Sequence, residues 1–155
     1  MAININVEYG QALLKHLDKL KKELIKPVKL KREIAGYLKS ETQDKFDREI
    51  DPWGVPWIPS QRVLASGGKT LYKTGRLAAS FAVGMEGENI FLGQMSNVKY
   101  FPPHQWGYTT KKSKKKVKPR PMLPLRGGHN EVDLPLSYES GIKTVIQKWL
   151  DELIP

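Results

Sequence analysis

Few residues of this chain have the types and spacing that chemistry needs. The histidines His16, His104 and His129 stand far apart in sequence, without the close spacings that bind zinc or a di-iron centre. The absence of cysteine excludes disulfides, thiolate metal sites and cysteine nucleophiles. No nucleophile elbow, phosphate-cradling glycine loop or pair of loop carboxylates is present. We therefore expect no catalytic residue, no cofactor and no metal site, and we interpret His104 as a packed or hydrogen-bonded loop residue rather than a general base.

The densest charge lies in KKSKKKVKPR, residues 111–120, where seven of ten residues are Lys or Arg and none is acidic. Its cations repel one another along an extended chain, so we expect a mobile, solvated loop between two ordered elements. No aromatic residue is interleaved, which disfavours base stacking and leaves sequence-independent contact with phosphates. The alternative is contact with an acidic assembly partner. The candidate contact residues are Lys111, Lys112, Lys114, Lys115, Lys116, Lys118 and Arg120.

The net charge of +10 belongs to one part of the chain. Between Asn89 and Asn130 there is no Asp or Glu, and the Lys and Arg residues of this window carry +9, which leaves about +1 for the rest. A protein that binds nucleic acid with its whole surface more often spreads its charge along a face. The sequence therefore predicts a nearly neutral body with one basic insertion.

Length and composition bound the class of protein. A chain of 155 residues has room for one domain with a real core, and its 39% of apolar residues is slightly below the globular average. The first residues, MAININVEYG, lack the cationic start and apolar stretch of a signal peptide. No apolar run approaches the roughly 20 residues that a membrane span needs. We expect a single soluble domain over residues 1–155, made inside the cell and without a membrane contact.

Two amphipathic helices are predicted in residues 1–50. Leu13, Leu17, Leu20 and Leu24 follow one another at steps of four and three, which indicates a helix over about 9–25. Pro27 should end it, because proline lacks an N–H and clashes with the preceding turn. A second helix over about 28–49 has its own stripe, formed by Leu30, Ile34, Leu38, Phe46 and Ile50 beside Tyr37. We expect the two helices to face the core as a pair, in preference to a coiled-coil site for a partner.

Residues 51–108 are expected to contain an irregular loop followed by a β-hairpin. Residues 51–70 begin with DPWGVPWIPS, whose prolines and glycine break regular structure, and we expect its two tryptophans to fasten the loop to the core. A platform for stacking sugars or bases is the functional alternative. In residues 71–108, Thr74-Gly75-Arg76-Leu77 should form a turn into a short helix or strand. Phe81, Val83 and Met85 then alternate with small residues before a turn at 86–89, which predicts a hairpin.

The last part of the chain, residues 120–155, follows the mobile basic loop predicted at 109–119. Met122–Leu125 could form a short strand or the start of a helix, and a C-terminal helix should begin at a Ser137 cap. Its apolar positions are Ile142, Val145, Ile146, Trp149, Leu150 and Leu153. These elements together predict an α+β fold, with N-terminal helices and a C-terminal helix packed on a small antiparallel β-sheet.

Four stretches of the chain resemble sequence blocks of the phage virion morphogenesis family, the tail-completion proteins of Mu-like and P2-like bacteriophages and prophages. They are the helix end with DPWGVPW, the block LYKTGRLAAS, the block YFPPHQWG and the block RPML, and in this order they cover about residues 28–155. Trp53 and Met122 differ from the residues usual in the family. The matching residues are Phe46, Asp51, Pro52, Gly54, Trp57, Leu71, Thr74, Gly75, Leu77, Tyr100, His104, Gln105, Trp106, Gly107, Pro121 and Leu123.

The resemblance implies structural roles for some of these residues. Trp57 would close its loop over the helix–sheet core, and Gly75 would permit a tight turn into the next element. Gly107 would end the His-Gln-Trp block where the chain leaves the body. The basic segment falls where the resemblance places a long, variable loop.

The resemblance also implies a function, namely a structural protein without catalysis that completes or terminates the phage tail where it joins the head. Such proteins are expected to act as rings of identical subunits, commonly six-fold, in contact with neighbouring tail and neck proteins. The protein would then be found in the virion, at the tail or neck, and in the cytoplasm of the bacterial host during assembly. The residues themselves leave one alternative open, a nucleic-acid-binding module that uses Lys111–Arg120 on phosphates.

Overall fold

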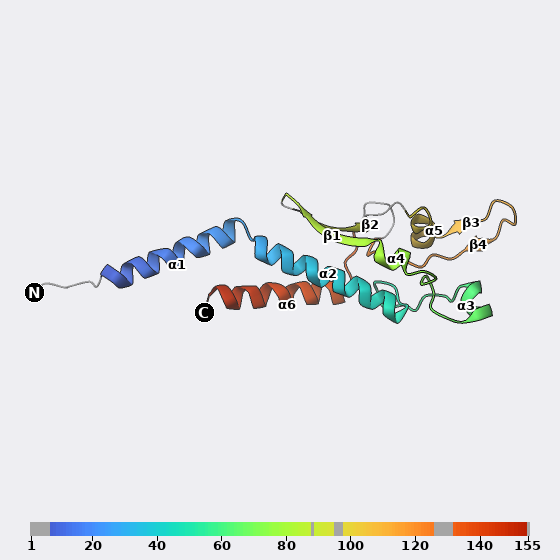
Figure 1. Ribbon diagram of the computed structural model, residues 1–155, viewed down its shortest axis with the longest axis horizontal. Coiled ribbons are helices and arrows are strands. Elements are labelled where there is room, and N and C mark those ends of the chain that lie inside the picture. The colour runs from blue at the N-terminus through green and yellow to red at the C-terminus, as the bar shows by residue number, and fades with distance from the viewer. Residues whose placement is uncertain (1–6, 88, 95–97, 126–131, 155) are drawn as a thin grey trace, which may run out of the picture.

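The repeated apolar steps of the N-terminal third form two helices in the computed structural model of the protein, which describes residues 7–87, 89–94, 98–125 and 132–154 (Figure 1). Helix α1 is Val7–Ile25 and helix α2 is Val28–Arg48. Pro27 separates them, as predicted, because a helix is not continued through a residue without an N–H. Helix α2 ends at Glu49, whose left-handed backbone, with φ of 55°, turns the chain into the DPWGVPW loop.

The C-terminal helix α6, Leu136–Leu153, lies antiparallel to α2 (Figure 1). At one end of the pair the Lys29 ammonium contacts the Glu152 carboxylate at 2.5 Å. At the other end the Tyr37 hydroxyl donates to the Ser137 carbonyl oxygen at 3.0 Å. The predicted Ser137 cap is wrong, because the chain is already extended at Pro135 and the helix begins before Ser137 without a capping side chain.

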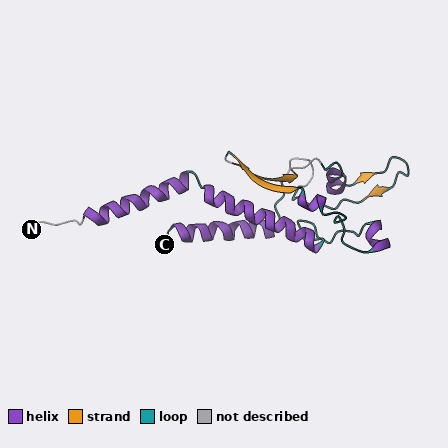
Figure 2. Ribbon diagram, in the orientation of Figure 1, coloured by secondary structure: helices purple, strands orange, loops and turns teal. Residues whose placement is uncertain are grey.

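The predicted hairpin is present and packs on α2. Strand β1 is Phe81–Glu86 and strand β2 is Asn89–Gln94, paired antiparallel with Phe81 opposite Gln94. Residue 88 of the predicted turn lies outside the described residues. Helix α2 thus contacts the hairpin on one side and α6 on another, as Figure 2 shows. The predicted α+β class is confirmed.

Three short helices and a second hairpin complete the described part of the fold. Helix α3 is Gln61–Ser66, α4 is Arg76–Ala79 and α5 is Phe101–Trp106. Strand β3, Tyr108–Thr109, pairs with strand β4, Lys116–Val117. Leu125 makes only an isolated bridge with Val132, so the described residues near it contain no regular strand.

Two predictions for these segments are wrong, because each overlooked a short helix. The loop 51–70 is not irregular throughout, since the Ser60 hydroxyl accepts from the Val63 N–H at 3.3 Å and starts α3. His104 lies on α5 rather than in a loop. Prolines are well tolerated in the first turn of a helix, where an N–H has no partner within the helix.

The core lies where α2 ends, under the first hairpin. Its buried apolar residues are Phe46, Trp57, Leu77, Ala78, Val98 and Met122. The Phe46 ring is central, with centroids 5.2 Å from Trp57 and 5.3 Å from Phe81, and Phe81 in turn lies 5.6 Å from Phe101. Trp57 is only 5% exposed, so the prediction that it fastens the loop to the core is confirmed.

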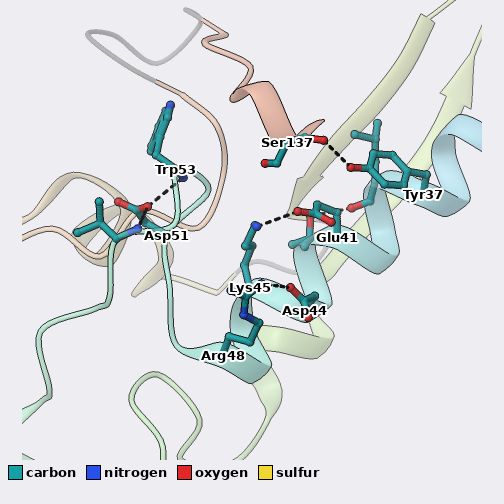
Figure 3. A network of polar contacts seen from close by, with 11 residues as sticks. Tyr37, Glu41, Asp44, Lys45, Arg48, Asp51, Trp53 and Ser137 are labelled. Atoms are coloured by element: carbon teal, nitrogen blue, oxygen red, sulfur yellow. Dashed lines mark hydrogen bonds and ion pairs between the residues drawn. The ribbon is translucent and has the colours of Figure 1, made fainter. Parts of the chain in front are cut away.

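The C-terminal half of α2 carries a network of polar contacts beside this core (Figure 3). The Lys45 ammonium contacts the Glu41 carboxylate at 2.8 Å, and the two side chains are only 7% and 19% exposed. The Arg48–Asp44 pair, one turn along, is at 3.1 Å and lies on the surface. Because a single buried charge is costly, Lys45 and Glu41 stabilise the helix only as a pair.

Helix α1 departs from the prediction that both N-terminal helices face the core. It projects from the body beyond the end of α6 (Figure 1). Three leucines of its predicted core stripe are largely exposed: Leu13 by 58%, Leu17 by 49% and Leu24 by 60%. The leucine spacing predicted the helix correctly, but spacing alone does not say what covers the apolar face.

Candidate functional site: a basic hairpin on a buried clasp

The basic segment forms the β3–β4 hairpin and its turn, which a single threonine closes. The Thr110 N–H donates to the Lys115 carbonyl oxygen at 2.9 Å, and the Thr110 hydroxyl accepts from the Lys115 N–H at 3.0 Å. Ser113 shares a hydrogen bond with the same hydroxyl at 2.6 Å. The segment is thus a defined turn rather than an irregular loop, while its mobility stays a prediction.

The candidate contact residues separate into two groups. The six lysines from Lys111 to Lys118 are exposed, and none has an ion pair with any residue in the described ranges. Arg120 is only 8% exposed and belongs to the base of the hairpin. Only the lysines are therefore available to a partner.

Gln105 joins the two ends of the basic segment. Its side-chain Oε1 accepts from the backbone N–H groups of Met122 at 2.8 Å and Leu123 at 3.1 Å. Its Nε2 donates to the Leu123 carbonyl oxygen at 3.0 Å. One buried amide, 1% exposed, thus bonds three backbone groups, of which the Leu123 carbonyl oxygen also accepts from the Leu125 N–H at 2.8 Å.

Arg120 and Trp57 tie the same junction to the DPWGVPW loop. The Arg120 Nε donates to the Ile58 carbonyl oxygen at 2.6 Å, while its backbone N–H donates to the His104 carbonyl oxygen at 2.6 Å. The Trp57 Nε1 donates to the Pro121 carbonyl oxygen at 2.9 Å. We call Trp57, Gln105 and Arg120 the clasp, because these side chains connect three segments that are far apart in sequence.

Gly107 lets the hairpin leave the body at the clasp. Its φ is 72°, and a Cβ at this position would lie 2.7 Å from the Val117 carbonyl oxygen and 3.1 Å from Pro119. No side chain fits there without moving the returning strand. The role expected of Gly107 therefore has a direct steric cause.

A hollow of about 420 Å³ lies next to the clasp. Leu71, Leu77 and Tyr100 give it apolar walls, and His104 and Thr74 line it as well. Arg62, Lys73 and Arg76 also line the hollow, and none of its lining residues is acidic. Sequence reasoning did not single out these cations, although Lys73 and Arg76 flank the Thr-Gly pair. Their arrangement suits an acidic partner with an apolar side chain.

The surroundings of His104 disfavour its charged form. Burial, followed by the nearby Arg120 guanidinium, lowers the pKa of His104 below its ordinary value. Its Nδ1 is buried and has no hydrogen-bond partner among the described residues, and its ring contacts Tyr100. The predicted packed histidine is therefore close to what is observed, although one nitrogen faces no donor or acceptor.

Three further matching residues, Asp51, Gly54 and Gly75, shape turns. The Asp51 carboxylate accepts from the N–H groups of Trp53 at 2.9 Å and Val55 at 2.8 Å, which closes the loop before Trp57 (Figure 3). Gly54 in this loop has φ of 88°. Gly75, with φ of 70°, directly precedes α4, so the predicted turn into a short helix is confirmed.

The described ranges 7–87, 89–94, 98–125 and 132–154 offer little else for chemistry. Within them no group of three or more His, Asp or Glu side chains could hold a metal ion. His129 lies outside them. No described helix is long and apolar enough to cross a membrane.

A sequence model of the phage virion morphogenesis family matches residues 9–132 of the chain. No curated protein and no solved structure matches it. The family match begins within α1 and ends before α6, so its limits differ from the 28–155 that the sequence blocks suggested. It contains the clasp, the hollow and the whole basic hairpin.

Proposed function

Because the chain belongs to the phage virion morphogenesis family, we propose that it is a structural tail-completion protein that joins or terminates the phage tail without catalysis. The observation that carries this proposal is the clasp. Gln105, Trp57 and Arg120 come from three of the matching blocks. Their side chains donate hydrogen bonds to backbone carbonyl oxygens of the same chain. Residues used in this way position a projecting element and are not free to bind a substrate.

The projecting element is the basic hairpin, and its proposed partner is an acidic surface of a neighbouring tail or neck protein. Six exposed lysines without ion pairs can be neutralised only from outside the described chain. The cationic hollow beside the clasp adds a second contact of the same sign. We further propose that the subunit assembles with copies of itself into a ring, commonly of six, in the virion.

The proposal is tested by imaging particles made with and without this gene. Loss of the protein should give tails and heads that fail to join, or tails of abnormal length, and infectivity should be restored by the wild-type gene in trans. A variant with Lys112, Lys114 and Lys116 changed to Glu should fold normally and fail to restore infectivity. Normal, infectious virions without the protein would exclude the assembly role.

A nucleic-acid-binding function is the second candidate, favoured by the same exposed lysines. Neutralising about six phosphates would make log K fall by about five for each tenfold rise in salt. A mobility shift with random duplex DNA at two salt concentrations measures this. Sub-micromolar binding with that slope by the wild-type protein, and its loss in the triple Glu variant, would favour DNA over an acidic protein partner.

A further inference from the structure

The cationic hollow beside the clasp is formed where three segments that are far apart in sequence meet. Its lining comes from the start of α3, from residues 71–77, which run into α4, and from α5 with the preceding Tyr100. These elements lie at the same end of the molecule as the β3–β4 hairpin (Figure 1). His104 connects the two, because it lines the hollow and its carbonyl oxygen accepts from the Arg120 N–H at the base of the hairpin.

The apolar part of this lining is continuous with the core. Leu77 is a core residue that is only 3% exposed, and Leu71 packs against the same core cluster. Tyr100, 42% exposed, adds an aromatic side chain to the lining. An apolar side chain that enters the hollow therefore extends the core outwards, a gain that a purely charged ligand does not obtain.

The backbone is held in an unfavourable conformation at Leu71. Its φ is 61°, in the left-handed region that residues with a side chain rarely adopt. The buried Thr70 before it is fixed in place, because its N–H donates to the Glu49 carboxylate at 2.7 Å. The strain at Leu71 is thus maintained by a contact with a distant part of the chain. Such strain is concentrated at sites whose shape serves binding.

The cations of the hollow lack an acidic neighbour in the part of the chain that the structure describes. Lys73 and Arg76 are exposed and take part in no ion pair there. Arg62 is held by the chain itself, since its guanidinium donates to the Lys69 carbonyl oxygen at 2.5 Å. The sequence accounts for this surplus of positive charge, because residues 52–85 contain no Asp or Glu. Cations that their own chain leaves unpaired favour a partner with carboxylates.

The combination of apolar and cationic groups favours a peptide over a nucleic acid. Phosphates would meet the cations, but the nucleic-acid backbone carries no apolar side chain to cover Leu71 and Leu77. A base could stack only on Tyr100, whose ring is already in contact with the His104 ring, with centroids 6.3 Å apart. An acidic peptide with one apolar residue matches both kinds of group in the hollow.

We propose that the hollow binds an acidic peptide segment of a neighbouring virion protein, with one apolar side chain inserted against Leu71 and Leu77. Carboxylates on both sides of that side chain pair with Lys73 and Arg76. The inference rests on the proposed assembly function and names the chemistry of one of its contacts. The hairpin lysines recognise charge alone, whereas the hollow also recognises an apolar side chain. The hollow therefore supplies specificity, and the hairpin supplies long-range attraction.

Three synthetic peptides separate the two kinds of recognition. The first has one leucine between two pairs of acidic residues, the second has alanine in place of the leucine, and the third has lysines in place of the acids. Each carries a fluorophore, and its binding to the full chain is followed by fluorescence anisotropy. We expect the leucine peptide to bind at least about tenfold more tightly than the alanine peptide, because the leucine side chain becomes buried. The lysine peptide should not bind.

Variants of the protein place this preference in the hollow. The Lys73→Glu, Arg76→Glu variant should bind the leucine peptide at least about tenfold more weakly. The matched control is Lys15→Glu, Lys39→Glu, which changes the net charge equally at exposed positions of α1 and α2. Unfolding midpoints of both variants should stay within about 2 °C of wild type, because all four residues are exposed. The triple Glu variant of the hairpin should bind more weakly but keep the preference for leucine over alanine.

Each of the other outcomes contradicts the proposal. Equal affinity for the leucine and alanine peptides would show that charge alone is recognised. Equal weakening by the hollow variant and its control would show that the site lies elsewhere. Absence of binding by either acidic peptide at about 1 mM would exclude the site. Binding of random duplex DNA that is lost in the hollow variant, without binding of the peptides, would assign the hollow to nucleic acid.

The outcome for the proposed function is read separately, by supplying variant genes in trans to phage that lack this protein. The gene with Lys73→Glu and Arg76→Glu should fail to restore infectivity, whereas the control gene should restore it. If both genes restore infectivity, the hollow is not used in assembly and the assembly role stands. If virions lacking the protein are normal and infectious, the assembly role is wrong, whatever the peptides show.

Discussion

At the scale of single residues, the junction under the basic hairpin depends on one amide. Gln105 supplies two acceptor contacts and one donor contact to backbone groups of Met122 and Leu123. A buried backbone group that loses its partner costs about 1–3 kcal/mol, more than the gain from making the bond. The clasp is therefore sensitive to the polar chemistry of Gln105 rather than to its volume.

The Gln105→Met substitution should lower the free energy of unfolding by about 2–4 kcal/mol, because the volume is kept and the hydrogen bonds are lost. Urea unfolding followed by circular dichroism measures it. The control is Gln147→Met on the exposed side of α6, where the amide contacts only Asp151 and the change should stay within about 0.5 kcal/mol. Equal effects of the two substitutions would contradict the role given to Gln105.

Tyr138 is a second residue whose environment sets a measurable property. It is fully buried, and burial raises its pKa to about 12. Its hydroxyl has no hydrogen-bond partner of good geometry among the described residues, and the nearby Thr42 hydroxyl offsets only part of the effect of burial on this pKa. The unfolded chain releases this proton near pH 10 and the folded chain only near pH 12, so folding loses stability as pH rises through this window.

We expect Tyr138 to remove about 2–3 kcal/mol of stability between pH 9 and pH 12. The Tyr138→Phe variant should lack this part of the decline, and at pH 7 its stability should equal or exceed that of wild type because an unpaired hydroxyl is gone. Denaturant unfolding of both proteins at several pH values gives the difference, in which other titrating groups cancel. Parallel pH curves would show that the Tyr138 hydroxyl is solvated.

At the scale of elements, α2 organises the fold because it contacts both α6 and the first hairpin. Its fit against α6 depends on Gly141, where an added Cβ would lie 2.1 Å from the Tyr37 ring. Gly36 on α2 is the natural comparison, since nothing lies within 4 Å of a Cβ there. The two helical glycines differ only in what surrounds them.

The Gly141→Ala variant should be destabilised by about 1–3 kcal/mol, because the clash with Tyr37 exceeds the gain in helix propensity. The Gly36→Ala variant should be stabilised by about 0.5–1 kcal/mol, because only the propensity changes. Thermal and urea unfolding measure both. A stabilised Gly141→Ala protein would mean that α6 does not pack on Tyr37.

The β3–β4 hairpin is an element whose base and tip should behave differently. Two residue pairs hold its strands, and so short a ladder is marginal by itself. Its base is fixed by the clasp. Its mobility, predicted from mutual repulsion of the lysines, should therefore be confined to the turn.

Hydrogen exchange of the free protein should show this contrast. The amides of Met122 and Leu123, bonded to the Gln105 side chain, should be protected nearly as well as those of α2. Those of residues 111–113 should exchange close to the rate of an unfolded peptide. Full protection of the whole segment in the monomer would overturn the predicted mobility.

At the scale of the whole molecule, the exposed leucine face of α1 and the exposed lysines of the β3–β4 hairpin lie at opposite ends. Figure 1 shows α1 at one end and the β3–β4 hairpin at the other, with the α2–α6 pair and the β1–β2 hairpin between them. One surface is apolar and the other cationic, so they suit different partners.

Removal of residues 1–26 should leave the body folded. The stability of the remaining chain should differ from that of the full chain by less than about 1 kcal/mol, because α1 meets the body only near Trp149 and Glu152. Urea unfolding of the two chains measures the difference. A truncated chain that unfolds would show that α1 belongs to the core, as the sequence first suggested.

The sequence predicted the features that are local in the chain. Apolar residues spaced three and four apart predicted helices α1, α2 and α6 close to their observed bounds. The alternation of apolar and small residues predicted the first hairpin. The sequence blocks gave the family, which the match over 9–132 confirms. Helix α3 was missed because its start depends on one capping residue, Ser60, whose competing conformations have similar energies.

By itself, then, the sequence determined the helices, the first hairpin, the confinement of charge to one segment and the family. Only the tertiary structure decided which apolar face is covered. The stripes of α1 and α2 look alike in sequence, yet Phe46 is buried at 1% and Leu13 is exposed at 58%. The tertiary structure also decided that the Arg120 side chain is buried in the clasp, where it donates to the Ile58 carbonyl oxygen, whereas the neighbouring lysines are exposed. The physical reason is that periodicity fixes which side chains share a face, whereas burial depends on residues brought together from distant parts of the chain.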